Sequence, residues 1–214
     1  MDRLAGRNPV FEALHRGRRR VLRIFLDERA KPDPKLTRIL DLAQRAGTRV
    51  ERVERRRLDQ LAQGGVHNGI VAEAEALPSW TTKGLLNELF GQGKYPFIVM
   101  ADEIQYEHNL GAILRSAMGA GVDGLVIPTQ RGKGLTSVVQ RVAMGAAEEV
   151  PVVREGLSSA LKHCRKGGLR IVGADMDGQS CWDVDLTGPL VLVLGGESKG
   201  LSPTLRERCD QIVS

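Results

Sequence analysis

The chain has 214 residues and a net charge of +5, from 31 Lys and Arg against 26 Asp and Glu. This length allows one large domain or two small ones, each able to bury a core. No stretch is apolar for long enough to span a bilayer, and the N-terminus MDRLAGRNPV lacks the apolar core of a signal peptide. These features argue against a membrane or secreted protein, and we expect a cytoplasmic one.

The three cysteines and four histidines are scattered, and no two cysteines form a CxxC pair. This spacing indicates neither a disulfide framework nor a zinc site, so no metal is expected.

Positive charge is concentrated in the first third of the chain. Residues 1–78 hold 17 Lys and Arg against 11 Asp and Glu, whereas residues 79–214 carry a net charge of −1. Two Arg-rich runs, HRGRRR (15–20) and ERVERRRL (51–58), suit the phosphates of a nucleic acid, although such runs also occur on solvated helix faces. The candidate nucleic-acid contacts are Arg16, Arg18, Arg19, Arg20, Arg55 and Arg56.

Hydrophobic periodicity in the first part of the chain alternates between helix and strand. The expected elements are a helix at 8–17, a strand at 21–28, a helix at 34–47 ended by Gly47, a short strand at 48–53, a helix at 56–65 and a strand at 69–77. We therefore predict a small α/β domain over residues 1–77. Residues 78–96 have Pro and Gly at both ends and a short amphipathic helix between them, which indicates a linker.

From Phe97 the strands become longer and more continuously apolar, which indicates burial on both faces of a parallel sheet. Strands are expected at 97–104, 124–128, 150–153, 169–176 and 189–196, with helices at 109–121, about 136–148 and 156–167. Residues 97–214 are thus predicted to form a second α/β domain, with its ligands bound in loops at the carboxyl ends of the strands.

The stretch HNLGAILRSAMGAG (108–121) predicts an amphipathic helix. Its apolar band consists of Leu110, Ile113, Leu114, Ala117, Met118 and Gly121. Asn109 is a good N-cap for this helix, and Arg115 lies on the flank of the band, where an edge residue is often solvated or paired. These two polar residues are candidates for function.

The loop LGGESKGLS (194–202) follows the most apolar strand and precedes a helix that starts at Ser202-Pro203. Its glycines allow a ligand to approach the backbone closely, or simply permit a tight turn. Leu201 replaces the lysine of a phosphate-binding loop, which argues against nucleotide hydrolysis. No GxGxxG follows the first strand, so a nicotinamide cofactor is also poorly supported.

Together these two stretches resemble the SPOUT-class, SpoU/TrmH-type RNA ribose 2′-O-methyltransferases. ADEIQYEHNLGAILRSAMGAGVDGLVIP is similar to the first signature of that family, and VLVLGGESKGLS is similar to the second. The opening LAGRNPVFEALHRG and VLRIFLDE resemble the substrate-binding domain, itself like ribosomal protein L30e, that precedes the catalytic domain in the RlmB-like branch. The resemblance covers nearly the whole chain, with both motifs in the expected order.

The resemblance implies a small L30e-like α/β domain followed by a parallel-sheet α/β-knot (SPOUT) domain. It implies methyl transfer from S-adenosylmethionine to a ribose 2′-hydroxyl, most specifically of a guanosine in large-subunit (23S) rRNA, by a homodimer. Asn109, Arg115 and Glu197 take catalytic positions, and Leu194, Gly195, Gly196 and Gly200 take cofactor-binding positions. Arg115 would position the substrate and stabilise charge, because arginine stays protonated in proteins. Asn109 would orient Arg115 or the nucleotide, and Glu197 would hold the site or pair with Arg115.

The third signature of the family, which closes the knot, begins just after the point reached at CDQIVS (209–214). The knot-closing segment is therefore absent from this sequence, and we expect the chain to be part of a longer protein. On that interpretation a protein ending at Ser214 would be inactive or poorly folded alone.

Three other interpretations remain open. A tRNA could be the substrate in place of rRNA. The chain could also be a non-catalytic RNA-binding module, such as a ribosome assembly factor, although such a binder has no reason to keep Asn109, Arg115 and the glycine-rich loop together. A metabolic nucleotide-binding enzyme is disfavoured by Leu201 and by the cationic N-terminal part.

Overall fold

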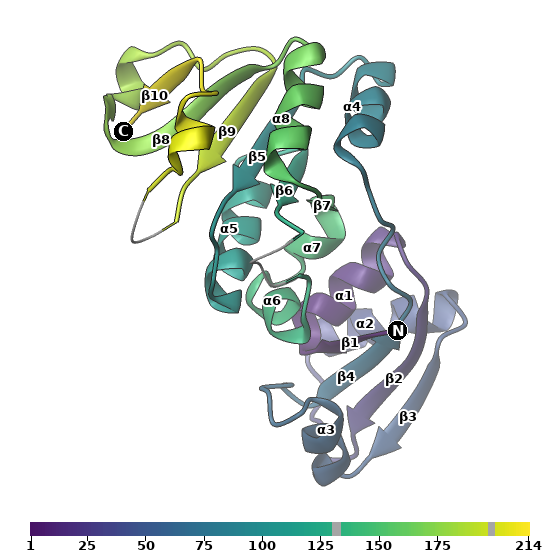
Figure 1. Ribbon diagram of the computed structural model, residues 1–214. Coiled ribbons are helices and arrows are strands. Elements are labelled where there is room, and N and C mark those ends of the chain that lie inside the picture. Colours follow the sequence, from purple (N-terminus) through teal and green to yellow (C-terminus); the bar gives the residue numbers. More distant parts are fainter. Residues whose placement is uncertain (130–133, 197–199) are drawn as a thin grey trace. The chain divides into compact units, whose positions relative to one another are not determined.

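The described part of the chain forms two units, each with its own sheet (Figure 1). The computed structural model describes residues 1–129, 134–196 and 200–214. Unit 1 contains Met1–Pro78, Gly111–Arg115 and Leu135–Glu149, and unit 2 contains Ser79–Leu110, Ser116–Gly134 and Val150–Ser214. The domain boundaries predicted at residues 77 and 97 stay a prediction.

Unit 1 contains a four-stranded mixed sheet. Its strands are β1 (Asp2–Ala5), β2 (Val21–Asp27), β3 (Arg49–Val53) and β4 (Ile70–Ala74). Their order is β1-β4-β2-β3, and β2 runs antiparallel to β4 and parallel to β3. The sequence analysis missed β1, because two of its four residues are charged and it pairs only with β4.

The two faces of this sheet bury different side chains of β2. Ile24 and Leu26 pack in a cluster with α1 (Arg7–Arg16) and α2 (Pro34–Arg45). Phe25 points the other way and packs in a separate cluster with α3 (Arg55–Leu61). Successive side chains of a strand alternate between faces, so this one apolar segment supports helices on both sides.

Helix α2 has strong start and stop signals. The Asp33 carboxylate accepts hydrogen bonds from the backbone N–H groups of Lys35 (2.9 Å) and Leu36 (3.1 Å), and Pro34 occupies the first turn. Gly47, just past the helix end, has a φ of 64°, as predicted for a terminating glycine. The expected helix is confirmed.

Unit 2 contains a six-stranded sheet in which every paired strand is parallel. Its strands are β5 (Phe97–Ala101), β6 (Gly124–Ile127), β7 (Val152–Arg154), β8 (Arg170–Gln179), β9 (Leu190–Leu194) and β10 (Gln211–Val213). Their order is β10-β8-β9-β5-β6-β7. The predicted parallel α/β sheet is confirmed, and the expected strand at 169–176 continues to Gln179.

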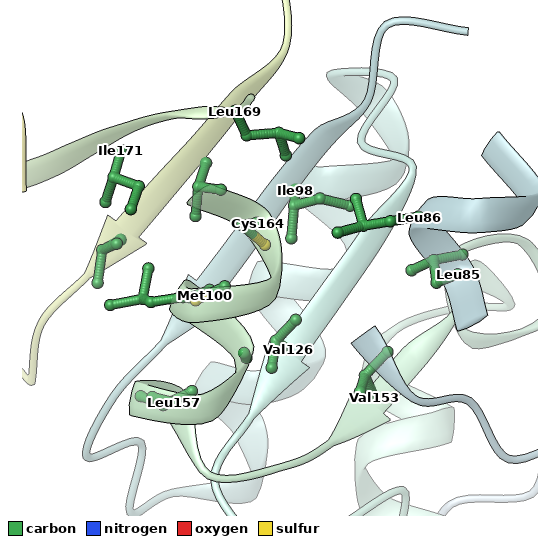
Figure 2. Close-up of a cluster of buried hydrophobic side chains, with 14 of the residues drawn as sticks. Leu85, Leu86, Ile98, Met100, Val126, Val153, Leu157, Cys164, Leu169 and Ile171 are labelled. Carbon is green, nitrogen blue, oxygen red and sulfur yellow. The ribbon is translucent and has the colours of Figure 1, made fainter. Parts of the chain in front are cut away.

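Figure 2 shows the core of unit 2, where α8 (Leu157–Lys166) packs on the sheet beside Ile98, Met100 and Val126. Helix α4 (Thr82–Gly91), within the segment predicted as a linker, adds Leu85 and Leu86 to the same cluster. This segment therefore contributes to a core as well as connecting elements. Cys164 of α8 is buried in the cluster, and its burial raises the pKa of the thiol to about 12. Its position is consistent with a packing role.

Helix α5 (Glu107–Gly119) begins two residues earlier than predicted. The N-cap is Tyr106, whose backbone is extended, and the backbone N–H of Asn109 donates to the Tyr106 carbonyl at 3.1 Å. The prediction that Asn109 caps the helix is wrong, because Asn109 lies inside the first turn, where its backbone is already helical. Leu110 and Leu114 of the predicted apolar band are buried.

The single helix expected at about 136–148 is two helices, α6 (Ser137–Val142) and α7 (Ala146–Glu149). The break occurs at Met144 and Gly145, with φ values of 54° and 103°. A Cβ on Gly145 would lie 2.2 Å from Glu12 Cγ of α1, so the close approach to α1 requires glycine here.

The described residues contain no helix long and apolar enough to cross a membrane. The same residues contain no group of three or more His, Cys, Asp or Glu side chains placed to hold a metal ion.

Candidate functional site

The loop after β9 lies at the carboxyl edge of the unit 2 sheet, where β5 and β9 are neighbours. From β5 the chain proceeds to β6 and β7 on one side, while β9 and β8 lie on the other. Crevices at such switch points are the usual ligand sites of parallel sheets. The Asp102 N–H donates to the Leu194 carbonyl at 2.9 Å and ties the loop after β5 to the loop after β9.

The glycines of the loop after β9 are required by close backbone contacts. Gly196 and Gly200 exchange two backbone hydrogen bonds of 3.0 and 2.9 Å. A Cβ on Gly195 would lie 2.2 Å from the Gly200 carbonyl carbon, a clash with backbone that no side-chain motion relieves. Gly200 has a φ of 60°. Glu197, predicted to be catalytic, lies outside the described residues.

The described residues of this turn are mostly glycines. Leu194, Gly195, Gly196 and Gly200 are all half-buried, and three of the four carry no side chain. The residues predicted to hold S-adenosylmethionine therefore lie together at this edge of the sheet.

Two aspartates and an arginine brace the neighbouring strand end. Arg206, in α9 (Pro203–Arg206), pairs with Asp175 at 2.9 Å and with both carboxylate oxygens of Asp177, each at 2.9 Å. The hydrogen bonds that Arg206 donates to the Asp177 carboxylate raise the pKa of the Arg206 guanidinium above its ordinary value. A Cβ on Gly200 would lie 3.0 Å from Asp175 Oδ1, so this cluster lies directly against the glycine loop. The cluster was not predicted from the sequence, because Asp175 and Asp177 of β8 meet Arg206 of α9 only after folding.

Asn109 and Arg115 lie on the same helix but on different faces. Six residues of α-helix separate them by about 9 Å along the axis and by about 120° around it. This helical geometry does not favour direct orientation of Arg115 by the Asn109 side chain, so orientation of the nucleotide is the better proposal for Asn109.

Arg115 is exposed, and its Nη1 lies 3.5 Å from the Sδ of Met144. It forms no ion pair with any residue that the structure describes, so its charge is uncompensated there. Thioether sulfur is a weak acceptor and leaves the planar guanidinium available to a stronger anionic partner. The Arg115 guanidinium is therefore accessible to an anion.

Three arginines of the first Arg-rich run have partners within the protein. Arg19 has no exposed side-chain surface and pairs with Glu148 and with Asp2, the latter at 2.7 Å. Arg18 donates to the Glu149 carbonyl at 2.8 Å, and Arg16 pairs with the Glu149 carboxylate at 2.7 Å. A buried, paired guanidinium cannot reach a phosphate, so the assignment of Arg19 to the RNA surface is withdrawn.

The remaining predicted contacts are exposed. Arg20 lies just before β2, and Arg55 and Arg56 begin α3. Arg55 lies 4.0 Å from Asp27, a distance at which an exposed pair is weak. These three residues remain candidates for contact with RNA.

Comparison with known proteins assigns the family. A model of the SpoU rRNA Methylase family matches residues 96–214, and a model described as RNA 2′-O ribose methyltransferase substrate binding matches residues 3–80. The chain belongs to the SpoU rRNA methylase family.

Individual SpoU relatives cover the whole chain. It is 35% identical to the 23S rRNA (guanosine-2′-O-)-methyltransferase RlmB of Shewanella oneidensis, over 100% of this chain and 87% of the relative. It is 36% identical to RlmB of Pseudomonas putida, over 100% of this chain and 86% of the relative. The fold matches the crystal structure of an AdoMet-bound rRNA methyltransferase from Sinorhizobium meliloti with a TM-score of 0.77 at 18% identity, over 99% of this chain and 77% of that one.

Proposed function

We propose that this SpoU-family protein transfers a methyl group from S-adenosylmethionine to the ribose 2′-hydroxyl of a guanosine in 23S rRNA. The observation that carries the proposal is the similarity along the full chain to two RlmB proteins, at 35% and 36% identity. The glycine-rich edge of the unit 2 sheet and the uncompensated Arg115 are consistent with it.

The cofactor, when bound, supplies a methyl group activated by its positively charged sulfonium sulfur. Gly195 and Gly200 would hold it through backbone groups of a turn that packs so closely that it tolerates no side chain at Gly195. Leu194 and Gly196 complete the same turn. Asp175, held by Arg206, lies against this turn beside Gly200.

Arg115 would act on the RNA. Its guanidinium stays protonated, so it would not remove the proton of the 2′-hydroxyl. It would hold an adjacent phosphate through its planar fork and stabilise the negative charge that develops on the attacking oxygen. Asn109 would orient the nucleotide, and Glu197 is retained as a candidate from the sequence alone.

The exposed arginines of unit 1 would contribute further phosphate contacts. Arg20, Arg55 and Arg56 remain in this set, and Arg16 and Arg18 could join it where Glu149 releases them. By family resemblance we also propose a homodimer, acting in the cytoplasm, where rRNA is available.

The proposal is tested with labelled S-adenosylmethionine and unmodified 23S rRNA transcript, followed by nucleoside mass spectrometry. The expected product is 2′-O-methylguanosine, formed only when protein and cofactor are both present. A tRNA transcript is tested in parallel, and preferential methylation of that transcript would assign tRNA, in place of rRNA, as the substrate. RNA binding without cofactor binding or methyl transfer would instead support a non-catalytic module.

A further inference from the structure

A basic cavity of about 830 Å³ lies in unit 1, and Arg115 forms part of its wall. Its polar lining residues are Arg7, Asn8, Lys35, Asn68, Arg115 and Arg141. Four of the six are cations, and no described carboxylate lines the cavity. Four separate helices provide the cations, so no single run of charges in the sequence reveals the site.

The charges of the cavity are only partly compensated. Arg7 pairs with Asp33, which lies outside the lining, and Lys35 donates to the Asn8 side-chain oxygen. Like Arg115, Arg141 forms no ion pair with a described residue. Concentrated positive charge in a concave surface raises the local potential and attracts anions.

Neighbouring groups hold several of these side chains in place. Lys35 Nζ lies 5.4 Å from the centre of the Phe11 ring, and Asp33 binds Arg7 while it caps α2. The backbone N–H groups of Leu36 and Lys35 and the Arg7 charge hold the pKa of the Asp33 carboxyl below its ordinary value. Asp33 therefore stays ionised and keeps Arg7 in place at neutral pH.

The size and lining of the cavity fit a nucleotide unit better than a single small ion. Its volume lies within the range of ordinary ligand sites, roughly 300–1,000 Å³. Asn8 and Asn68 offer amide groups to a base or ribose, and the exposed side chains of Val66 and Met144 offer apolar surface. Cations, amides and apolar surface together match the phosphate, sugar and base of RNA.

We propose that the basic cavity binds the RNA segment beside the target nucleotide, with Lys35 and Arg141 as phosphate-binding positioning residues. The inference rests on the proposed function, since it places substrate RNA next to Arg115. The cavity is an RNA-binding site in addition to the exposed arginines, because none of its four cations belongs to the two Arg-rich runs. On this proposal Arg115 contacts the same RNA strand whose phosphates Lys35 and Arg141 bind.

The test measures binding of a fluorescently labelled 23S rRNA hairpin by anisotropy at several salt concentrations. The variants are Arg141→Gln and Lys35→Gln, made separately, and each is expected to weaken binding roughly 5- to 10-fold. Each lost phosphate contact should also make the slope of log affinity against log salt less negative, by about 0.7 for a single strand. Arg141→Lys, which retains the charge, should recover most of the slope.

The matched control is Arg45→Gln, which removes an exposed arginine at the end of α2, outside the cavity. It loses the same charge and should leave the salt slope unchanged. Equal effects of Arg45→Gln and Arg141→Gln, or unchanged slopes in both cavity variants, would overturn the proposal. Thermal unfolding shows whether each variant is folded. If one of the two cavity variants does not fold, the salt slope of the other decides whether the cavity binds RNA.

The same experiment separates this inference from the proposed function. Methyl transfer with unchanged slopes in the cavity variants would reject the cavity alone. Cavity-dependent RNA binding without methyl transfer by the unsubstituted protein would reject the proposed reaction and leave the RNA site standing.

Discussion

At the scale of single residues, Arg115 is the side chain on which the proposed reaction depends most. Arg115→Ala is expected to reduce methyl transfer by roughly 10²–10³-fold, because it removes a charge placed where negative charge develops. Single-turnover rates with saturating cofactor and RNA measure this effect. Cofactor affinity should change little, since Arg115 lies outside the glycine loop, and near-normal turnover would contradict the assigned role.

Arg19 and Glu148 form a buried ion pair whose role is structural. Their side chains are 0% and 2% exposed. Burial raises the pKa of the Glu148 carboxyl above its ordinary value, although the Arg19 charge opposes this shift. Arg19→Met should lower the free energy of unfolding by about 3–5 kcal/mol, because it leaves a buried carboxylate without its partner. Urea unfolding measures the loss, and Arg20→Met, at an exposed neighbour, should change stability by less than about 0.5 kcal/mol.

The Glu148 carboxyl also determines how the stability of Arg19→Met should depend on pH. A carboxyl whose folded-state pKa is raised binds more protons in the folded state, so its contribution to stability is present at low pH and lost as pH rises through that pKa. Removing Arg19 raises that pKa further, since an opposing charge is lost. The destabilisation by Arg19→Met should therefore shrink as pH falls toward the ordinary carboxyl range. A loss that is constant between pH 7 and pH 5 would show that Glu148 is not its cause.

At the scale of elements, the turn after β9 combines a strand end, three glycines and a neighbouring ion-pair cluster. Gly195→Ala should weaken S-adenosylmethionine binding by roughly 5- to 100-fold, because a Cβ would meet the Gly200 backbone at 2.2 Å and force the turn apart. Calorimetric titration with the cofactor measures the change. Gly156→Ala is the control, since Gly156 has an ordinary φ of −62° and no atom within 4 Å of an added Cβ. Unchanged affinity in Gly195→Ala would remove this turn from the cofactor site.

At the scale of the whole molecule, the uneven charge of the sequence should dominate RNA affinity. Residues 1–78 carry a net charge of +6, whereas the rest of the chain carries −1. If Arg20, Arg55, Arg56, Lys35 and Arg141 each hold one phosphate of a single strand, log affinity should fall with log salt with a slope of about −3.5. Anisotropy titrations between low and physiological salt measure this slope. Binding that is insensitive to salt would contradict a phosphate-based interface.

Most elements could be predicted from the sequence because their signals are local. Apolar runs such as LVLVL in β9 and the Asp33-Pro34 start of α2 depend on neighbours along the chain. Predictions failed where a distant contact decided the outcome. The helix expected at about 136–148 is broken because Gly145 packs against Glu12, more than 100 residues away in sequence.

For the candidate site, sequence by itself determined the family signatures, the glycine loop and the candidate roles of Asn109 and Arg115. Only the tertiary structure decided which charges are available. Arg19 and Arg20 are adjacent in an Arg-rich run, yet one is buried against Glu148 and the other is exposed. Lys35 and Arg141 gave no local signal, and they line one cavity with Arg115 only after folding. The physical reason is that periodicity reports which face of an element is buried, whereas the partners of a charge are set by long-range packing.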